Sequence, residues 1–330
     1  MSDVKVLERH QIAIYLGALA AGAAVGLTWP GTSHPLEAGI YPVLGALLYL
    51  TCLQVPFTQV TAGFRDARFL VTVLAVNFVA VPLAVAGLVA VAPLEQAVLL
   101  GVLLTLLTPC IDYVIVFSGL AGGDSQRLVA ASPLLMLAQL AVLPVLLWLF
   151  VGPELADIVE IRPFVEAFGI LILLPLALAW TSQAFAARRR AGQVVIRGLN
   201  AAMVPVMAAT LFVVVGSQVP KLRGRFNDVA TAVPVYAAFL VVMAVVGVAA
   251  ARVARLDVGR ARALVFTGAT RNSLVVLPLA LALPAAYAVT PAIVVTQTLV
   301  ELVGMLVYIR LVPRLIPAKE AAGTDLPSAT

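Results

Sequence analysis

The chain has 330 residues, of which 62% are hydrophobic and only 11% are charged. Soluble globular proteins carry about 25% charged residues, so this composition excludes a cytosolic enzyme, a secreted disulfide scaffold and a disordered chain. The 21 Lys and Arg residues exceed the 16 Asp and Glu residues, but the basic residues lie in short loops between apolar runs, as membrane topology requires. The sequence therefore predicts a membrane protein whose main partner is the lipid bilayer, with no role in binding nucleic acid.

Ten apolar segments each approach the length of about 20 residues that a helix needs to cross a bilayer. They cover residues 11–29, 39–60, 69–91, 96–119, 129–151, 164–185, 200–219, 230–251, 263–287 and 291–312. The N-terminus leads into the first segment without the apolar core and small-residue exit of a cleavable signal. We therefore expect an all-α integral membrane protein with ten transmembrane helices.

The loop charges predict an orientation. With ten spans, sixteen of the 21 basic residues lie on the side of the N-terminus and four on the opposite side. The positive-inside rule then places both termini, residues 1–10 and 313–330, in the cytoplasm. We expect the protein to lie in the plasma membrane as a multi-pass protein.

Ten spans divide into two units of five, and an odd-numbered unit that is repeated once inserts the second time upside down. The predicted domains are a first five-helix repeat, residues 11–151, and an inverted second repeat, residues 164–312. Aligning Thr108 with Thr270 sets TPCIDYVIVF of the fourth span beside TRNSLVVLPL of the ninth. Both segments carry polar residues at the same depth, which supports the repeat.

Both aligned spans are interrupted. Pro109 removes a backbone donor and clashes with the preceding turn, and the run GATRNS at 268–273 weakens the ninth span. Pro109 alone is also compatible with a simple kink. Two interrupted helices at matching repeat positions, however, indicate a transporter binding site, because unwound backbone at membrane depth persists only where it is buried in protein or lines a cavity.

Three ionisable residues lie inside spans: Asp112 in the fourth, Arg271 in the ninth and Glu301 in the tenth. Each costs about 2.5 to 3.5 kcal/mol to insert, so such residues face the protein interior. Asp112 and Arg271 lie at matching depth, which predicts an ion pair between the repeats and leaves Glu301 to titrate. The pair could serve structure alone or could couple substrate and ion movement.

Cys110 lies between Pro109 and Asp112 in a polar cluster, where its thiolate would be a soft ligand for a thiophilic partner. Cys52, in an apolar context, is predicted to be a packing residue. The two cysteines exclude a disulfide framework by number and a zinc site by spacing. The uncharged polar residues of the spans are expected to form interhelical hydrogen bonds: Gln54, Asn77, Gln139 and Gln297.

Three stretches, TPCIDYVIVFSGLAGGDSQ, FTGATRNS and TLVELVGMLVY, resemble segments of the arsenical-resistance (arsenite efflux) permease family of the bile acid/sodium symporter superfamily. The resemblance covers roughly residues 11–313. It implies that Cys110 is the thiol used in arsenite translocation, as a transient arsenic(III) ligand, and that Glu301 is the carboxylate required with it. It also implies that Asn272 lies where the two broken helices cross. The predicted substrate-binding residues are therefore Cys110, Asn272 and Glu301, together with the polar residues Thr108 and Ser273 of the broken spans.

The chain departs from the family pattern at Asp112, where no acid is typical, and at Arg271, where Asn is typical. An acidic residue that usually follows is absent, since Leu274 and Val275 occupy those positions. Sodium-coupled relatives hold sodium at this crossing. We infer that the Arg271 guanidinium occupies the region as a fixed cation, which would make transport sodium-independent.

The sequence thus predicts a secondary transporter that exports arsenite or antimonite from the cytoplasm by alternating access, in exchange for protons. No cofactor and no obligatory protein partner are expected. The alternative is a carrier of a small organic anion that uses Arg271 as a carboxylate clamp. An intramembrane enzyme built on Asp112 and Glu301 is a weaker alternative, because both histidines, His10 and His34, lie outside the spans.

Overall fold

The computed structural model describes residues 2–54, 66–111, 113–152, 173–188, 190–222 and 226–318. Across these residues the chain is built of helices, and extended pairing is limited to one isolated antiparallel bridge between Pro109 and Arg271. The all-α prediction is therefore confirmed. Parts of the predicted spans 39–60 and 164–185, together with Asp112, lie outside the described residues.

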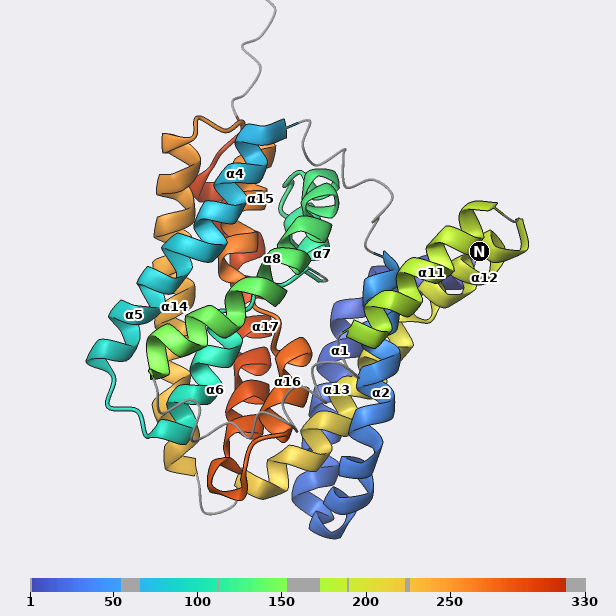
Figure 1. Ribbon diagram of the computed structural model, residues 1–330, viewed down its shortest axis with the longest axis vertical. Coiled ribbons are helices and arrows are strands. Elements are labelled where there is room, and N and C mark those ends of the chain that lie inside the picture. The colour runs from blue at the N-terminus through green and yellow to red at the C-terminus, as the bar shows by residue number, and fades with distance from the viewer. Residues whose placement is uncertain are drawn as a thin grey trace, which may run out of the picture.

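Five helices pack on one another as a unit that we call the flanking bundle, at the right of Figure 1. They are α1 (Ser2–Thr28), α2 (Ser33–Gln54), α11 (Leu174–Arg188), α12 (Arg190–Ala201) and α13 (Met203–Gln218). Short 3-10 turns follow α1 at Pro30–Thr32 (η1) and α13 at Val219–Leu222 (η6).

The second group, the crossing bundle, contains the predicted interrupted spans (Figure 1). It comprises α4 (Ala67–Ala75), the π-helical turn η4 (Val76–Ala80), α5 (Val81–Val91), α6 (Gln96–Leu106), α7 (Tyr113–Leu120), α8 (Ser125–Val151), α14 (Phe226–Val253), α15 (Val258–Ala269), α16 (Ser273–Leu281), the 3-10 turn η7 (Ala285–Tyr287) and α17 (Thr290–Leu315). The two bundles meet where α13 and η6 contact α17 and where α2 contacts α16.

The fourth and ninth predicted spans are each two helices, as the sequence predicts. The fourth is α6 followed by α7, and the ninth is α15 followed by α16. The two broken pairs run in opposite directions. At one end the amide of Asp124, which follows α7, donates to the carbonyl of Gly259 in α15 at 2.9 Å. At the other end the hydroxyl of Thr290 donates to the carbonyl of Ala97 in α6 at 2.8 Å.

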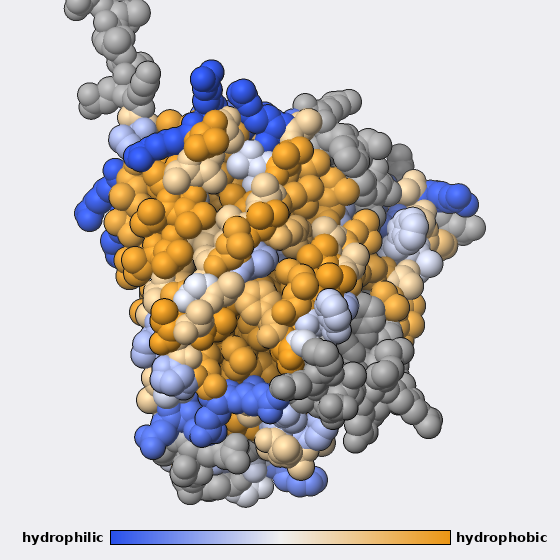
Figure 2. Space-filling model, turned by 60° about the vertical axis from the view of Figure 1, so that its left-hand side comes forward, coloured by the Kyte–Doolittle hydropathy of each residue, from blue (hydrophilic) through white to orange (hydrophobic). Residues whose placement is uncertain are grey.

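Helix length alone does not establish ten spans. Among the described residues, five segments are long and apolar enough to cross a membrane, and a sixth is obtained if α12 and α13 are joined across their 43° bend. The halves α6, α7, α15 and α16 contain 11, 8, 12 and 9 residues, too few individually for about 30 Å of hydrocarbon. Figure 2 shows an apolar surface belt between hydrophilic residues at the two ends.

Helix α12 was not predicted, because its sequence RAGQVVIRGLNA reads as a basic loop between two spans. Its apolar side chains Val194 and Val195 are exposed, and the helix packs on α11 and α2. Apolar residues on a short basic helix at the end of a bundle are typical of a helix that lies in the membrane interface.

Glycines allow α1 and α13 to approach closely. A methyl group added at Gly22 would lie 2.6 Å from the carbonyl oxygen of Phe212, and one at Gly26 would lie 2.7 Å from that of Gly216. Small residues at such a contact let two backbones pack without intervening side chains. The flanking bundle is therefore joined at this contact by direct backbone packing.

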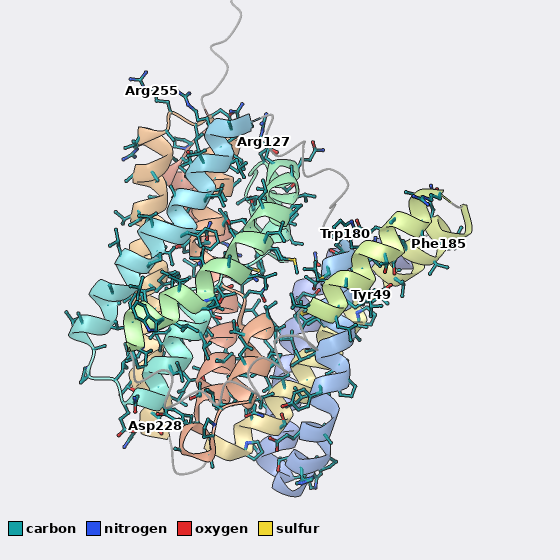
Figure 3. All side chains as sticks on the ribbon, in the orientation of Figure 1. Tyr49, Arg127, Trp180, Phe185, Asp228 and Arg255 are labelled. Carbon is teal, nitrogen blue, oxygen red and sulfur yellow. The ribbon has the colours of Figure 1, made fainter. Side chains whose placement is uncertain are left out.

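Arginines gather at one end of the crossing bundle, where Figure 3 labels Arg127 and Arg255. Asp66 is the N-cap of α4 and accepts from the guanidinium of Arg127 and, at 3.1 Å, from that of Arg260. Arg262 reaches from α15 to the carbonyls of Ala121 at 2.9 Å and Ile316 at 2.9 Å. We call this region the arginine-rich end; its ion pairs join α4, α8 and α15.

Candidate functional site

The two broken helices meet through their backbones. The amide of Cys110 donates to the carbonyl of Thr270 at 3.2 Å, and the amide of Asn272 donates to the carbonyl of Thr108 at 2.9 Å. Pro109, which has no amide hydrogen, lies between them. Helix ends leave backbone groups unsatisfied, and in the membrane interior these groups need protein partners, so each break supplies partners for the other.

The two hydrogen bonds are equivalent under the alignment of Thr108 with Thr270. That alignment sets Cys110 on Asn272, so the bond from Cys110 to Thr270 becomes the bond from Asn272 to Thr108. A local twofold relation of this kind is what two inverted copies of one broken helix would produce where they cross.

Arg271 is fully buried at the crossing. Its Nη2 atom lies 2.8 Å from the carbonyl oxygens of Thr267 and Gly268 and 2.8 Å from Oδ1 of Asn77. Its Nη1 atom donates to the carbonyl of Leu106 at 3.3 Å. Four neutral oxygens from three elements, α6, η4 and α15, thus surround one guanidinium.

The surroundings of Arg271 favour a positive charge. Leu106 ends α6, and Thr267 and Gly268 lie in the last turn of α15, where the helix dipole is negative. The Arg271 Cζ atom also lies 5.6 Å from the centroid of the Phe239 ring on α14, within the range of a cation–π contact. The breaks therefore direct carbonyl oxygens at the guanidinium.

Glu301 is also buried and is hydrogen-bonded to the backbone of Arg271. Its Oε2 atom accepts from the amide of Arg271 at 2.8 Å and from the side-chain amide of Gln297. The oxygen of Gln297 accepts from the hydroxyl of Ser273, which in turn accepts from the hydroxyl of Thr298 at 2.9 Å. A continuous polar chain therefore joins the carboxylate to the first residue of α16.

The side-chain oxygen of Asn272 caps the N-terminus of α16. Its Oδ1 atom accepts from the backbone amide of Val275 at 3.3 Å, while its Nδ2 atom has no hydrogen-bond partner among the described residues. The side chain is only 3% exposed. A buried donor of this kind is costly unless something accepts from it, so Asn272 can donate to an oxygen of a bound solute.

The structure brings most predicted site residues to one place. Cys110, Arg271, Asn272 and Ser273 lie at or beside the crossing, and Glu301 contacts it. Thr108 also lies there, but its hydroxyl donates to Leu104 of its own helix at 2.8 Å. The predicted ion pair between Asp112 and Arg271 involves a residue outside the described ranges and remains a prediction.

The interhelical roles predicted for two uncharged residues are confirmed, since Asn77 binds Arg271 and Gln297 binds Ser273. That Asn77 would contact the guanidinium was not predicted; a buried amide opposite an intramembrane charge is the signal that could have suggested it. The oxygen of Gln139, by contrast, has no partner among the described residues.

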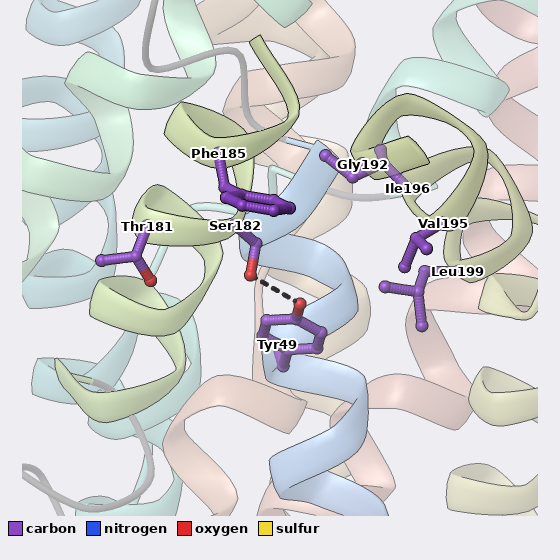
Figure 4. A pocket seen from close by; sticks show the side chains of 8 residues that line it. All are labelled: Tyr49, Thr181, Ser182, Phe185, Gly192, Val195, Ile196 and Leu199. Atoms are coloured by element: carbon purple, nitrogen blue, oxygen red, sulfur yellow. Dashed lines mark hydrogen bonds between the residues drawn. The ribbon is translucent and has the colours of Figure 1, made fainter. Parts of the chain in front are cut away.

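Two further features bear on ligands. Within the described ranges, no three His, Cys, Asp or Glu side chains group closely enough to hold a metal ion. A cavity of about 380 Å³ lies between α2, α11 and α12, where the hydroxyls of Tyr49 and Ser182 are 2.9 Å apart (Figure 4). None of the predicted site residues lines this cavity, so it is separate from the crossing.

Comparison with known proteins gives one match to a family. The model of the SBF-like CPA transporter family matches residues 31–310, which include both broken helices and most of the tenth predicted span. No curated protein matches the chain. This match does not confirm that the chain belongs to the arsenical-resistance permeases. This transporter family agrees with the apolar helices and indicates a membrane transporter, which is consistent with the prediction that the protein is not an enzyme. The chain belongs to the SBF-like CPA transporter family.

Proposed function

We propose that the protein is a secondary transporter that exports arsenite from the cytoplasm by alternating access, in exchange for protons. The observation that carries the proposal is the crossing itself, where two broken helices place a buried cysteine, a buried amide donor and a buried carboxylate together. Broken helices that meet at membrane depth form the binding sites of many secondary transporters.

The proposed architecture has ten spans in two inverted five-helix repeats. The antiparallel packing of the α6–α7 pair on the α15–α16 pair supports this architecture. The two hydrogen bonds between the breaks, which are equivalent when Thr108 is aligned with Thr270, support it as well. The proposal also places the arginine-rich end and both termini in the cytoplasm, because basic residues favour that side. Among the described residues, the helices of each bundle contact one another more extensively than they contact the other bundle, which favours a mechanism in which one bundle moves against the other.

The proposed substrate matches the chemistry of the crossing. Arsenite near pH 7 is a neutral trihydroxide, so it has a thiophilic arsenic atom and hydroxyl oxygens, and no net charge to desolvate. Cys110 would bind the arsenic transiently, since thiolates prefer soft partners: its sulfur replaces one arsenic hydroxyl group, which leaves as water with the thiol proton, and water reverses the exchange to release the trihydroxide. The Nδ2 atom of Asn272 would donate to a remaining hydroxyl oxygen. Ser273 links this position to the polar chain that ends at Glu301.

In the proposed coupling, Arg271 is a fixed cation and Glu301 carries the exchanged proton. Carbonyl oxygens of unwound helices are the groups that coordinate sodium in such transporters, and here the guanidinium already binds four oxygens. Transport should therefore proceed without sodium. The hydrogen bonds from Gln297 and Arg271 to Glu301 would hold the carboxylate in place as it gains and loses the proton.

The alternative, a carrier of organic anions that uses Arg271 as a clamp, has less support. A clamp would direct both terminal nitrogens at the substrate, whereas Nη1 and Nη2 of Arg271 donate to protein oxygens. The four oxygens that accept from this buried guanidinium form what we call the cage of Arg271, so the side chain has a structural role at the crossing.

The test is arsenite resistance in a bacterial host that lacks its own arsenite efflux permease. The wild-type protein should restore growth in arsenite, Cys110→Ser should abolish the effect, and Cys52→Ser, at the other buried cysteine, should retain it. Full resistance in the Cys110→Ser variant would exclude the thiol role.

The coupling is tested in everted membrane vesicles. We expect arsenite accumulation driven by a pH gradient, equal rates in sodium and choline buffers, and loss of the pH dependence in Glu301→Gln. Sodium dependence of the wild-type rate would exclude Arg271 as the fixed cation.

A further inference from the structure

A cavity of about 490 Å³ opens at the arginine-rich end between the ends of α14, α15 and α17. Its walls are apolar and include Val248, Leu256, Leu315 and Ile316, whereas Arg252 and Arg255 are the charged residues that line it. Among the described residues that line the cavity, none is acidic, and the neighbouring Asp257 is paired with Arg260 at 2.7 Å. The combination of two guanidinium groups with apolar walls suits a ligand that has an anionic head and a hydrocarbon part.

Arg255 holds an unusual backbone conformation beside this cavity. Its φ angle is 50°, and among the described residues no other non-glycine residue has a positive φ. The amide of Arg255 donates to the carbonyl of Arg252 at 3.0 Å, and that of Leu256 donates to Ala251 at 3.0 Å. These bonds form the helix-ending motif in which the left-handed position normally belongs to glycine, so an arginine here is retained against its backbone preference.

The outer face of α14 leads an apolar ligand to the cavity. Val241 and Val245 are each 67% exposed on the surface that faces away from the other helices, and one turn of helix separates them. Arg252 follows seven residues after Val245, which is about 10 Å along the helix axis. Hydrocarbon can therefore lie along α14 while a phosphate lies at the arginines.

We propose that this cavity binds a phospholipid with an anionic headgroup. Its phosphate lies between the guanidinium groups of Arg252 and Arg255, and an acyl chain lies along Val241, Val245 and the apolar wall. Basic pockets between membrane helices bind anionic lipids in this manner. A free phosphate ion would use the arginines but would leave the apolar wall without a ligand.

The proposed lipid site lies beside hydrogen bonds that join two helices of the crossing bundle, α15 and α17. The carbonyl of Ile316, a residue that lines the cavity, accepts from Nε and Nη2 of Arg262 at 3.1 and 2.9 Å. Bound lipid would shield these hydrogen bonds between α17 and α15 from water. The lipid should therefore stabilise the end of α17.

The test measures lipid binding by native mass spectrometry of the full-length protein in detergent, with phosphatidylglycerol and phosphatidylcholine as probes. Wild-type protein should retain phosphatidylglycerol in preference to phosphatidylcholine. The double variant R252A/R255A should bind phosphatidylglycerol about 25-fold more weakly, because each arginine near an anionic lipid contributes about a fivefold change in affinity. Arg310→Ala, which removes an exposed arginine of α17 outside the cavity, should bind as the wild type does.

Arg255→Gly separates lipid binding from folding. Glycine suits the left-handed position, so this variant should melt at a higher temperature than the wild type in lipid-free detergent, yet bind phosphatidylglycerol about fivefold more weakly. Three results would overturn the proposal: unchanged phosphatidylglycerol binding in the double variant, equal binding of both lipids by the wild type, or full displacement of the lipid by inorganic phosphate, which would indicate a site for free anions.

Discussion

The guanidinium of Arg271 and the side-chain oxygen of Asn77 lie 2.8 Å apart and join the break in the ninth predicted span to a π-helical turn of the third. A π-helical turn widens the helix and is frequent at functional sites. Both residues are buried, so the contact is made without competition from water. The cation of Arg271 is therefore part of the structure that holds the crossing together.

Replacing Arg271 with alanine should reveal a cation site. The variant removes a donor from four neutral buried oxygens. Because one unsatisfied buried acceptor costs about 1 to 3 kcal/mol, we expect the stability to fall by at least that amount. Sodium, which is coordinated by such oxygens, should restore part of the thermal stability of Arg271→Ala, whereas choline should not. The measurement is the melting temperature in detergent in sodium chloride and in choline chloride, with wild-type protein and Arg310→Ala as controls insensitive to the cation. If Arg271→Ala melts at the same temperature in both salts, the oxygens around Arg271 do not form a cation site.

Asn272 should contribute to stability through Oδ1, which caps α16, and to transport through Nδ2, which is proposed to contact the solute. Serine retains an N-cap oxygen for α16, whereas alanine does not, so Asn272→Ala should lose about 1 kcal/mol of stability and Asn272→Ser much less. Both variants lack the amide donor, and both should therefore transport poorly. Thermal unfolding combined with arsenite uptake in vesicles separates the two effects. Normal uptake by Asn272→Ser would show that Nδ2 does not contact the solute.

The contact between α1 and α13 should not tolerate a methyl group. Gly22→Ala places its new atom 2.6 Å from a backbone oxygen, which cannot move aside as a side chain can, so a cost of about 1 to 3 kcal/mol is expected. Gly17→Ala in the same helix is the matched control, because no atom lies within 4 Å of the added methyl and alanine favours helix. Thermal unfolding of the two variants should give shifts of opposite sign; equal shifts would argue against close packing at Gly22.

Asp66 should stabilise the crossing bundle through its two arginine partners. Asparagine retains the helix cap, so Asp66→Asn isolates the loss of the ion pairs with Arg127 and Arg260, for which we expect about 0.5 to 2 kcal/mol. Asp257→Asn also retains its cap and loses one local pair with Arg260, which is worth less. Melting curves at low and high salt measure the effect, since salt screens exposed pairs. The deficit of Asp66→Asn should shrink at high salt; a deficit independent of salt would assign it to packing.

The sequence predicted the crossing well because its determinants are local. Pro109 removes a backbone donor from the fourth span, the run GATRNS at 268–273 weakens the ninth, and charged residues in apolar spans face the protein interior. The alignment of Thr108 with Thr270 placed both breaks at the same depth, but it did not predict the backbone contacts of Cys110 with Thr270 and of Asn272 with Thr108. The helices of both broken spans accordingly begin and end within a few residues of the predicted breaks.

Other features depend on tertiary contacts that one sequence does not reveal. The cage of Arg271 uses backbone carbonyls, whose direction is set by where each helix ends. The π-helical turn at Asn77 precedes Pro82, which removes a helical donor, but a proline does not by itself specify a π turn. The sequence of α12 resembles a basic loop, and packing on α11 and α2 is needed to fix it as a helix. Periodicity and composition therefore predict elements better than they predict side-chain partners.

The joint between the two broken helices is made of main-chain atoms. Amide and carbonyl groups are the same in nearly every amino acid, so the joint places little demand on which side chains occupy positions 108, 110, 270 and 272. Proline at 109 is compatible with it because no amide hydrogen is required there. Evolution can thus exchange the side chains around the bound solute while the geometry of the joint is inherited unchanged, which gives one scaffold the capacity to serve chemically different cargoes.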